Sequence, residues 1–153
     1  TTVLMLRSIA AIARSEGEDL QSVETRLACL EVFALGGRTA DDNAAESGYF
    51  AVRAILSRQI SEAARYLLQR GFAEEGAPVL VRLMATIASR FGVTVSQKAA
   101  ASAVPVIGAA GGALVNTIFM DHFQKMARGH FIIRQLERIY GAEAVQEAYR
   151  NEG

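Results

Sequence analysis

A run of 22 residues without a charged side chain, Ala99 to Met120, constrains this chain more than any other stretch. About 20 predominantly apolar residues can cross a bilayer, so the run has the length of a membrane span. Its hydropathy is weak, because only eight of these residues are Val, Ile, Leu, Phe or Met and most of the others are alanine or glycine. Gly108 and Gly112 have the spacing of small residues that lets two helices approach closely.

Three interpretations of this run follow. The first is the closely packed start of a buried helix in a bundle, which suits its alanine and glycine content. The second is a segment that dips into a membrane or contacts lipid. The third is a phosphate-binding loop, which the residues match poorly because the lysine and the preceding strand of a P-loop are missing.

Elsewhere the apolar residues recur at helical spacing, and the only short β-branched cluster is Val93-Thr94-Val95. The sequence therefore predicts an all-α fold: a single-domain bundle over residues 1–153, of roughly six or seven helices with a long C-terminal helix. The fourth helix is apolar nearly all round, and we expect it to be central in the bundle. The expected helices span 2–15, from Ser22 to the glycine pair at 36–37, 43–70, 78–90, 96–103, from the glycine cluster at 108–112 to 140, and 142–150.

The charge composition excludes one class of partner. The chain has 16 basic and 16 acidic residues, and no basic excess of the kind that nucleic-acid binders use against phosphates. We therefore expect no nucleic-acid partner, and the same balance disfavours polybasic tethering to a membrane. Cys29 is the only cysteine, which excludes an intrachain disulfide and a multi-cysteine zinc site. This usage favours a reducing compartment such as the cytoplasm. If the charge-free run contacts lipid, we expect the protein at the periphery of the inner membrane.

Both histidines lie in the long C-terminal helix. On a helical wheel His122 and His130 fall in the same arc as Phe119, while Asp121 points mostly away. Eight residues of helix span about 12 Å, so the two histidines cannot bind one metal ion from a single straight helix. Each is either a hydrogen-bonded core residue or a ligand-binding group with partners from other helices. The third helix offers Glu46, Tyr49, Arg53 and Glu62 as such partners.

Several motifs taken together resemble one known family. They are GEDL at 17–20, CLEVFALGG at 29–37, PVIGAAGG at 105–112 and the run DHF…ARGHF…R.LE..YG at 121–141. In combination they are similar to the EcsC protein family of bacteria, over most of the chain. The resemblance implies no established biochemical activity. It also implies that Arg7, Cys29, Gly108, Gly111, Gly112, Asp121, His122, Phe123, Arg128, Gly129 and His130 belong to family motifs.

Two further expectations come from this resemblance. The family is named after an operon that also encodes an ABC transporter, which suggests a membrane-protein partner. Its members usually carry another N-terminal helical region with a glycine-rich apolar segment, and we expect this chain to lack that region. An apolar groove would then be exposed on this chain, which leaves both a monomer and an oligomer open.

Two functional hypotheses remain. The favoured one is a non-enzymatic helical module that binds an apolar ligand, a lipid, a membrane surface or a membrane-protein partner. The alternative is a metal-dependent hydrolase that uses Asp121, His122 and His130 with residues from other helices. Neither hypothesis names a cofactor. The candidate ligand-binding residues are His122, His130, Gly108, Gly111, Gly112, Phe119, Phe123 and Met126, and the candidate metal ligands are Asp121, His122 and His130.

Overall fold

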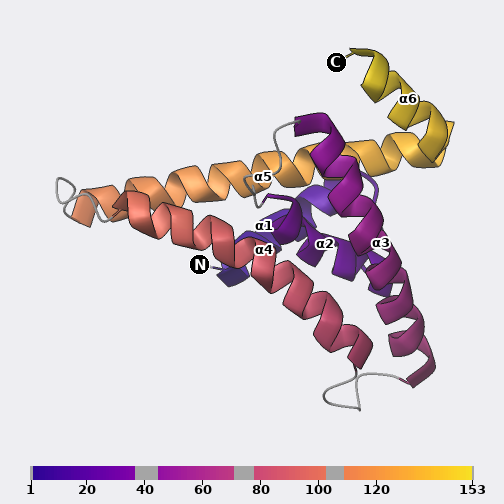
Figure 1. The fold of residues 1–153 in the computed structure, drawn as a ribbon, viewed down its shortest axis with the longest axis horizontal. Helices are drawn as coiled ribbons and strands as arrows, with labels where there is room; N and C mark the ends of the chain where they lie inside the picture. Colours follow the sequence, from indigo (N-terminus) through magenta and orange to yellow (C-terminus); the bar gives the residue numbers. More distant parts are fainter. Residues whose placement is uncertain (1, 37–44, 71–77, 103–108, 153) are drawn as a thin grey trace.

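The computed structural model describes the backbone of residues 2–36, 45–70, 78–102 and 109–152, and their side chains except at 2, 45–48, 92–116, 118 and 119. Over these ranges the chain is entirely helices and short turns, which confirms the all-α prediction (Figure 1). The six helices are α1 (Thr2–Ser15), α2 (Val23–Leu35), α3 (Ala45–Arg70), α4 (Pro78–Ser102), α5 (Ala109–Tyr140) and α6 (Ala142–Glu152).

Local sequence signals set several helix ends. Gly17 has a φ of +85° after α1, and Gly141 has a φ of +88° between α5 and α6. Only glycine adopts this left-handed conformation without a steric penalty, so both residues end the preceding helix as expected. Ser22 is the N-cap of α2, where its hydroxyl accepts a hydrogen bond from the Thr25 backbone N–H at 3.4 Å.

The expected break at Gly92 is wrong, because α4 continues without interruption from Pro78 to Ser102. A glycine inside a helix costs only about 1 kcal/mol relative to alanine, which does not force the helix to end. The two helices expected at 78–90 and 96–103 are therefore one.

The central helix is α2, not α4. Helix α2 contacts α1, α3, α4 and α5, and from Leu27 to Leu35 all its residues except Leu30 are buried. Its residues LACLEVFAL are apolar on every face apart from one glutamate, so the helix can be enclosed by neighbours. Phe33 of α2 packs against Phe91 and Phe123, with ring centroids 5.1 and 5.4 Å away.

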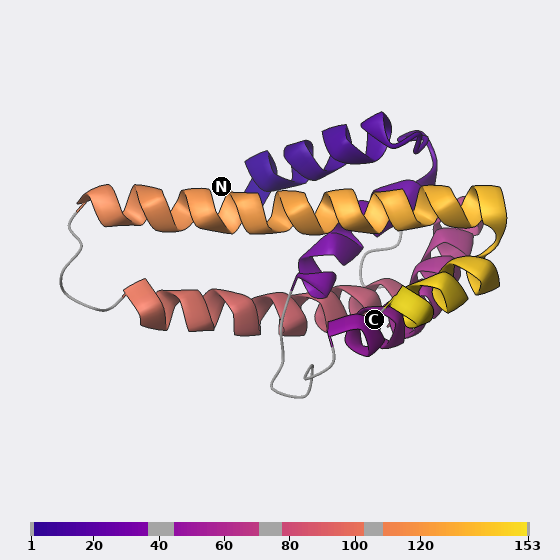
Figure 2. The same ribbon diagram turned by 90° about the horizontal axis from the view of Figure 1, so that it is seen from above.

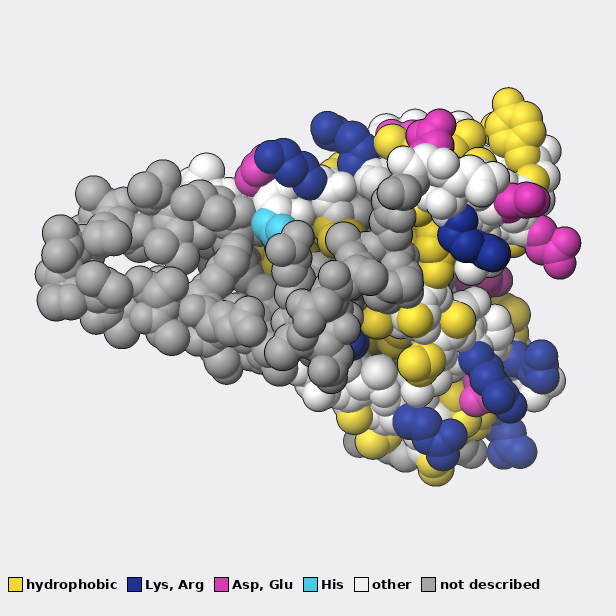
Figure 3. Space-filling view, turned by 45° about the horizontal axis from the view of Figure 1, so that its top comes forward, with side chains coloured by type: hydrophobic (Ala, Val, Ile, Leu, Met, Phe, Trp, Pro, Cys, Tyr) yellow, Lys and Arg dark blue, Asp and Glu magenta, His cyan; other side chains and the backbone are white. Residues whose placement is uncertain are grey.

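Helix α4 lies at the periphery, which contradicts the central position expected for it. Among its described side chains Leu83 and Ile87 are buried, but Val81 is 55% and Met84 46% exposed. Both apolar and basic side chains reach the surface on the described part of the face drawn in Figure 3. An apolar composition therefore did not mean burial for this helix.

Helices α4 and α5 form the extended end of the molecule. The C-terminal part of α4 and the N-terminal part of α5 lie together at one end, away from α1, α2, α3 and α6 (Figures 1 and 2). Helix α5 has 32 residues, which corresponds to a length of about 48 Å. Its second half, which carries the histidine at position 130, packs on the body of the protein, whereas the first residues of α5 and the last residues of α4 extend from the body.

Candidate functional site

His130 is the buried centre of a polar contact between three helices. Only 1% of this residue is exposed. Its Nδ1 lies 2.8 Å from the Tyr49 hydroxyl on α3, and its Nε2 lies 3.4 Å from Oε2 of Glu31 on α2. Burial raises the pKa of Tyr49 well above its ordinary value, so the phenol is neutral near pH 7 and its O–H can donate to Nδ1. A proton on Nε2 then faces the Glu31 carboxylate.

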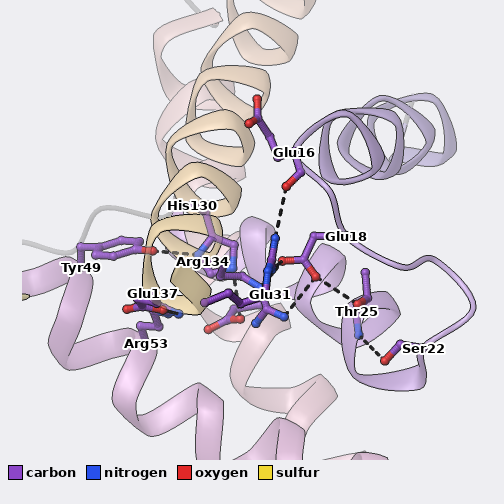
Figure 4. Close-up of polar contacts among 11 residues, drawn as sticks. Glu16, Glu18, Ser22, Thr25, Glu31, Tyr49, Arg53, His130, Arg134 and Glu137 are labelled. Atoms are coloured by element: carbon purple, nitrogen blue, oxygen red, sulfur yellow. Dashed lines mark hydrogen bonds and ion pairs between the residues drawn. The ribbon is translucent and has the colours of Figure 1, made fainter. Parts of the chain in front are cut away.

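Two salt-bridged clusters lie beside this contact (Figure 4). Glu18, in the turn after α1, accepts hydrogen bonds from Arg134 Nε at 2.8 Å, Arg138 Nη1 at 2.5 Å and the Thr25 hydroxyl at 3.1 Å. Burial by itself raises the pKa of Glu18, but the hydrogen bonds and positive charges of the two arginines outweigh it and lower the pKa from 4.5 to about 2. This carboxylate is therefore charged near neutral pH.

The second cluster joins α3 to α5. The guanidinium of Arg53 binds both carboxylate oxygens of Glu137, with one N–O distance of 2.7 Å. Desolvation lowers the pKa of Arg53, but the hydrogen bond to Glu137 together with the negative charges around the guanidinium outweighs this effect, and the net shift of the pKa is upward. A bidentate pair of this kind fixes orientation as well as distance. Arg53 also lies over the Tyr49 ring, 5.9 Å from its centroid.

One face of α5 supplies half of this network. His130, Arg134, Glu137 and Arg138 have the spacing i, i+4, i+7 and i+8, which places them on one side of a helix. They meet residues from the turn before α2, from α2 and from α3, so the network fastens α5 to the body of the protein. We refer to it as the buried polar network: Glu18, Thr25, Glu31, Tyr49, Arg53, His130, Arg134, Glu137 and Arg138.

The buried polar network contains three arginines and three glutamates: Arg134 and Arg138 pair with Glu18, Arg53 pairs with Glu137, and Glu31 lies beside His130. A pocket of about 360 Å³ beside the network has charged walls, and its lining includes Arg53, Arg134 and Glu137 but neither histidine nor Tyr49. The arginines that line it are already paired with carboxylates. These contacts indicate a structural clamp, because a buried ion pair held by several hydrogen bonds specifies which elements meet.

His122 and its neighbours have separate environments. The His122 Nε2 lies 2.9 Å from the Gly36 carbonyl oxygen, and its ring is only half-buried. Asp121 is exposed and forms a surface ion pair with Lys125 at 2.8 Å, as expected for a residue pointing away from the core. Phe123 is fully buried and Met126 partly buried against the core. Both histidines therefore make hydrogen-bond contacts within the fold, His130 in the core and His122 at its edge, and their role in ligand binding stays a prediction.

The side chains of Asp121, His122 and His130 do not meet at one point. Asp121 pairs with Lys125 on the surface, His122 contacts Gly36, and His130 contacts Tyr49. Within the described residues, no three His, Cys, Asp or Glu side chains gather in a way that could hold a metal ion. The hydrolase alternative stays a prediction, and the described geometry adds no support to it. Cys29 is buried, and burial raises the pKa of its thiol to about 11, which suits the core-packing interpretation.

Two glycines of the cluster, Gly111 and Gly112, belong to the extended end of the molecule. Gly108 lies outside the described residues, and for Gly111, Gly112 and Phe119 only the helical backbone of α5 is described. The charge-free run thus divides between the end of α4 and the start of α5. None of the described helices combines the length and the apolar character required to cross a membrane.

Sequence reasoning did not select most of the buried polar network. It proposed Tyr49 and Arg53 as partners for a histidine, and the contact between Tyr49 and His130 is confirmed. It missed the acidic residues Glu18, Glu31 and Glu137 as well as their arginine partners. The i, i+4, i+7, i+8 spacing on α5 was the signal that could have pointed to them.

The comparisons with known proteins give one match. No curated protein and no solved structure matches the chain. The model of the EcsC protein family matches residues 1–136. The matched range contains Glu18, Glu31, Tyr49, His130 and Arg134 of the buried polar network. Because the match covers most of its length, the chain belongs to the EcsC protein family.

Proposed function

We propose that this protein is a non-enzymatic helical module that contacts a membrane surface through the end formed by α4 and α5. The observation that carries the proposal is the position of the charge-free run. Its described residues are 99–102 at the end of α4 and 109–120 at the start of α5, in the parts of the two helices that leave the body together (Figure 2). A charge-free segment at the far end of a helix pair can enter the interface of a bilayer without exposing charged groups to lipid.

The buried polar network supports the proposal in a second way. It fastens the C-terminal half of α5 to the turn after α1, to α2 and to α3 through Glu18, Glu31 and Arg53. A helix held in this way at one end presents its other end in a fixed direction. The network then serves as the anchor of the α4–α5 end, and a location at the periphery of the inner membrane follows.

Binding to protein-free vesicles tests this proposal. The wild-type protein should co-sediment with liposomes. The double variant Leu114→Glu/Ile118→Glu places two charges four residues apart on α5, inside the charge-free run. Moving charged groups toward hydrocarbon costs more than 1.4 kcal/mol, so the vesicle affinity should fall at least about tenfold.

A matched control is available on α3. Ile55 and Leu68 are 61% and 76% exposed, so Ile55→Glu/Leu68→Glu makes the same chemical change on another surface. The control should bind vesicles like the wild type, and circular dichroism should show native helix content for both variants. Absence of vesicle binding by the wild type, or equal loss in both double variants, would contradict the proposal.

A further inference from the structure

The balanced overall charge conceals an uneven distribution along the chain. From position 78 to position 128 there are five basic residues and one acidic residue, whereas the rest of the chain has 11 basic and 15 acidic residues. The basic residues of this segment are Arg82, Arg90, Lys98, Lys125 and Arg128, and the acidic one is Asp121. The segment contains α4 and the first two-thirds of α5, which are the two helices that form the extended end.

The structure shows how some of these charges are used. Asp121 pairs with Lys125, which cancels one charge of each sign. Arg90 donates a hydrogen bond to the Ala34 carbonyl oxygen. Arg82 and Arg128 are exposed on α4 and α5. The two helices therefore carry a positive excess, and part of it lies on the surface.

Helix α4 also exposes an apolar face. Val81, Met84, Ala85 and Ala88 are all exposed and have the spacing i, i+3, i+4 and i+7, so they form one continuous strip along the helix. Arg82 lies next to this strip. A helix with an apolar strip and neighbouring basic side chains is suited to the headgroup region of a membrane, where the strip meets acyl chains and the basic groups meet phosphates.

We infer that the membrane bound by this protein is anionic, and that α4 lies against its headgroups through the strip that includes Val81 and Met84. This inference rests on the proposed function, because it names the lipid class of the same membrane and extends the contact from the α4–α5 end along α4 to the strip in its N-terminal half. The attraction comes from the positive excess of α4 and α5, since anionic headgroups draw basic residues to the surface over about one Debye length. The zero net charge of the whole chain does not oppose this, because the acidic excess lies in the segments that connect the helices, which contain seven acidic residues and one basic residue.

Vesicle binding separates this inference from the proposed function. The wild-type protein is titrated with vesicles of phosphatidylcholine alone and with vesicles that also contain phosphatidylglycerol, at low and at high salt. We expect binding to be at least about tenfold tighter to the anionic vesicles at low salt, and the difference to shrink at high salt. The double variant Arg82→Gln/Arg128→Gln should lose about tenfold in affinity for the anionic vesicles only.

The control removes the same charge elsewhere. Arg58 and Arg65 are exposed on α3, and Arg58→Gln/Arg65→Gln should leave the lipid preference unchanged. Equal affinity for both vesicle types would overturn the inference and leave the proposed function standing. If both double variants lost the same affinity for anionic vesicles, the assignment of the binding surface to α4 and α5 would be overturned. No binding to either vesicle would overturn the proposed function and this inference with it.

A second copy of the chain is the competing occupant of the α4 strip. Sedimentation velocity without lipid should show a monomer. A dimer that Met84→Glu dissociates would assign the strip to self-association and would overturn the inference.

Discussion

Replacing Glu18 by glutamine should weaken the attachment of α5 to the rest of the fold and should do so in a pH-dependent way. In the native protein the Glu18 carboxylate accepts hydrogen bonds from Thr25, Arg134 and Arg138. Glutamine keeps the size of the side chain but removes the charge, so both guanidinium groups lose their ionic partner. The free energy of unfolding at pH 7 should fall as a result.

The magnitude follows from the pKa of Glu18. Its fall from 4.5 to about 2 corresponds to about 3 kcal/mol, at about 1.4 kcal/mol for each pKa unit. The Arg138 side chain is 44% exposed, so water screens part of its interaction. We therefore expect a loss of about 2 kcal/mol in the variant at pH 7.

The sign of the pH dependence is fixed by the direction of the shift. Because the folded-state pKa is lowered, the contribution of Glu18 is fully present above pH 4.5 and disappears as the pH falls towards about 2. The difference in unfolding free energy between the wild type and Glu18→Gln should therefore be largest near neutral pH. It should approach zero near pH 2.

Urea unfolding followed by circular dichroism, repeated between about pH 7 and about pH 2, measures this difference directly. Glu147→Gln on the exposed surface of α6 is the control, and it should differ from the wild type by less than about 0.5 kcal/mol throughout. The reasoning is refuted if the wild type and Glu18→Gln stay equally far apart over the whole pH range, since the ionised carboxylate would then contribute nothing specific.

Two further predictions concern packing around α5. Tyr49→Phe removes the hydroxyl hydrogen-bonded to His130 and should cost about 1 kcal/mol in urea unfolding. Gly36→Ala would place a Cβ 2.5 Å from a ring carbon of the buried Phe123, so it should destabilise the fold by about 1–3 kcal/mol. In Gly129→Ala the added Cβ would have no neighbouring atom within 4 Å, and alanine is favoured over glycine inside a helix. This variant should therefore stabilise the fold by about 0.5–1 kcal/mol.

Each of these has an outcome that would count against it. Tyr140→Phe changes a tyrosine on the exposed surface and should be neutral, so a Tyr49→Phe variant as stable as Tyr140→Phe would mean that the contact with His130 contributes nothing. For the glycines, the signs should be opposite. A Gly36→Ala variant at least as stable as Gly129→Ala would show that the Phe123 ring moves aside without cost.

The periodicity of the chain was sufficient to predict the helices, because the 3.6-residue repeat and the helix-ending glycines are local properties. It also predicted that His130 faces inward and Asp121 outward, since both follow from angles around one helix. The prediction of a helix end at Gly92 was wrong, because the low helix propensity of one glycine was not enough to end α4. The local signal also misled on which helix is central, because α2 and α4 are both rich in apolar residues.

The partners of each polar side chain were decided only by the tertiary structure. The spacing of His130, Arg134, Glu137 and Arg138 places them on one face of α5, but it does not say that Glu18, 116 residues before Arg134, accepts hydrogen bonds from two of them. Nor does an unbroken charge-free run say that its two parts lie at the extended end of a helix pair. The sequence determines which residues share a face of a helix, while the packing of helices distant in the chain determines what that face meets.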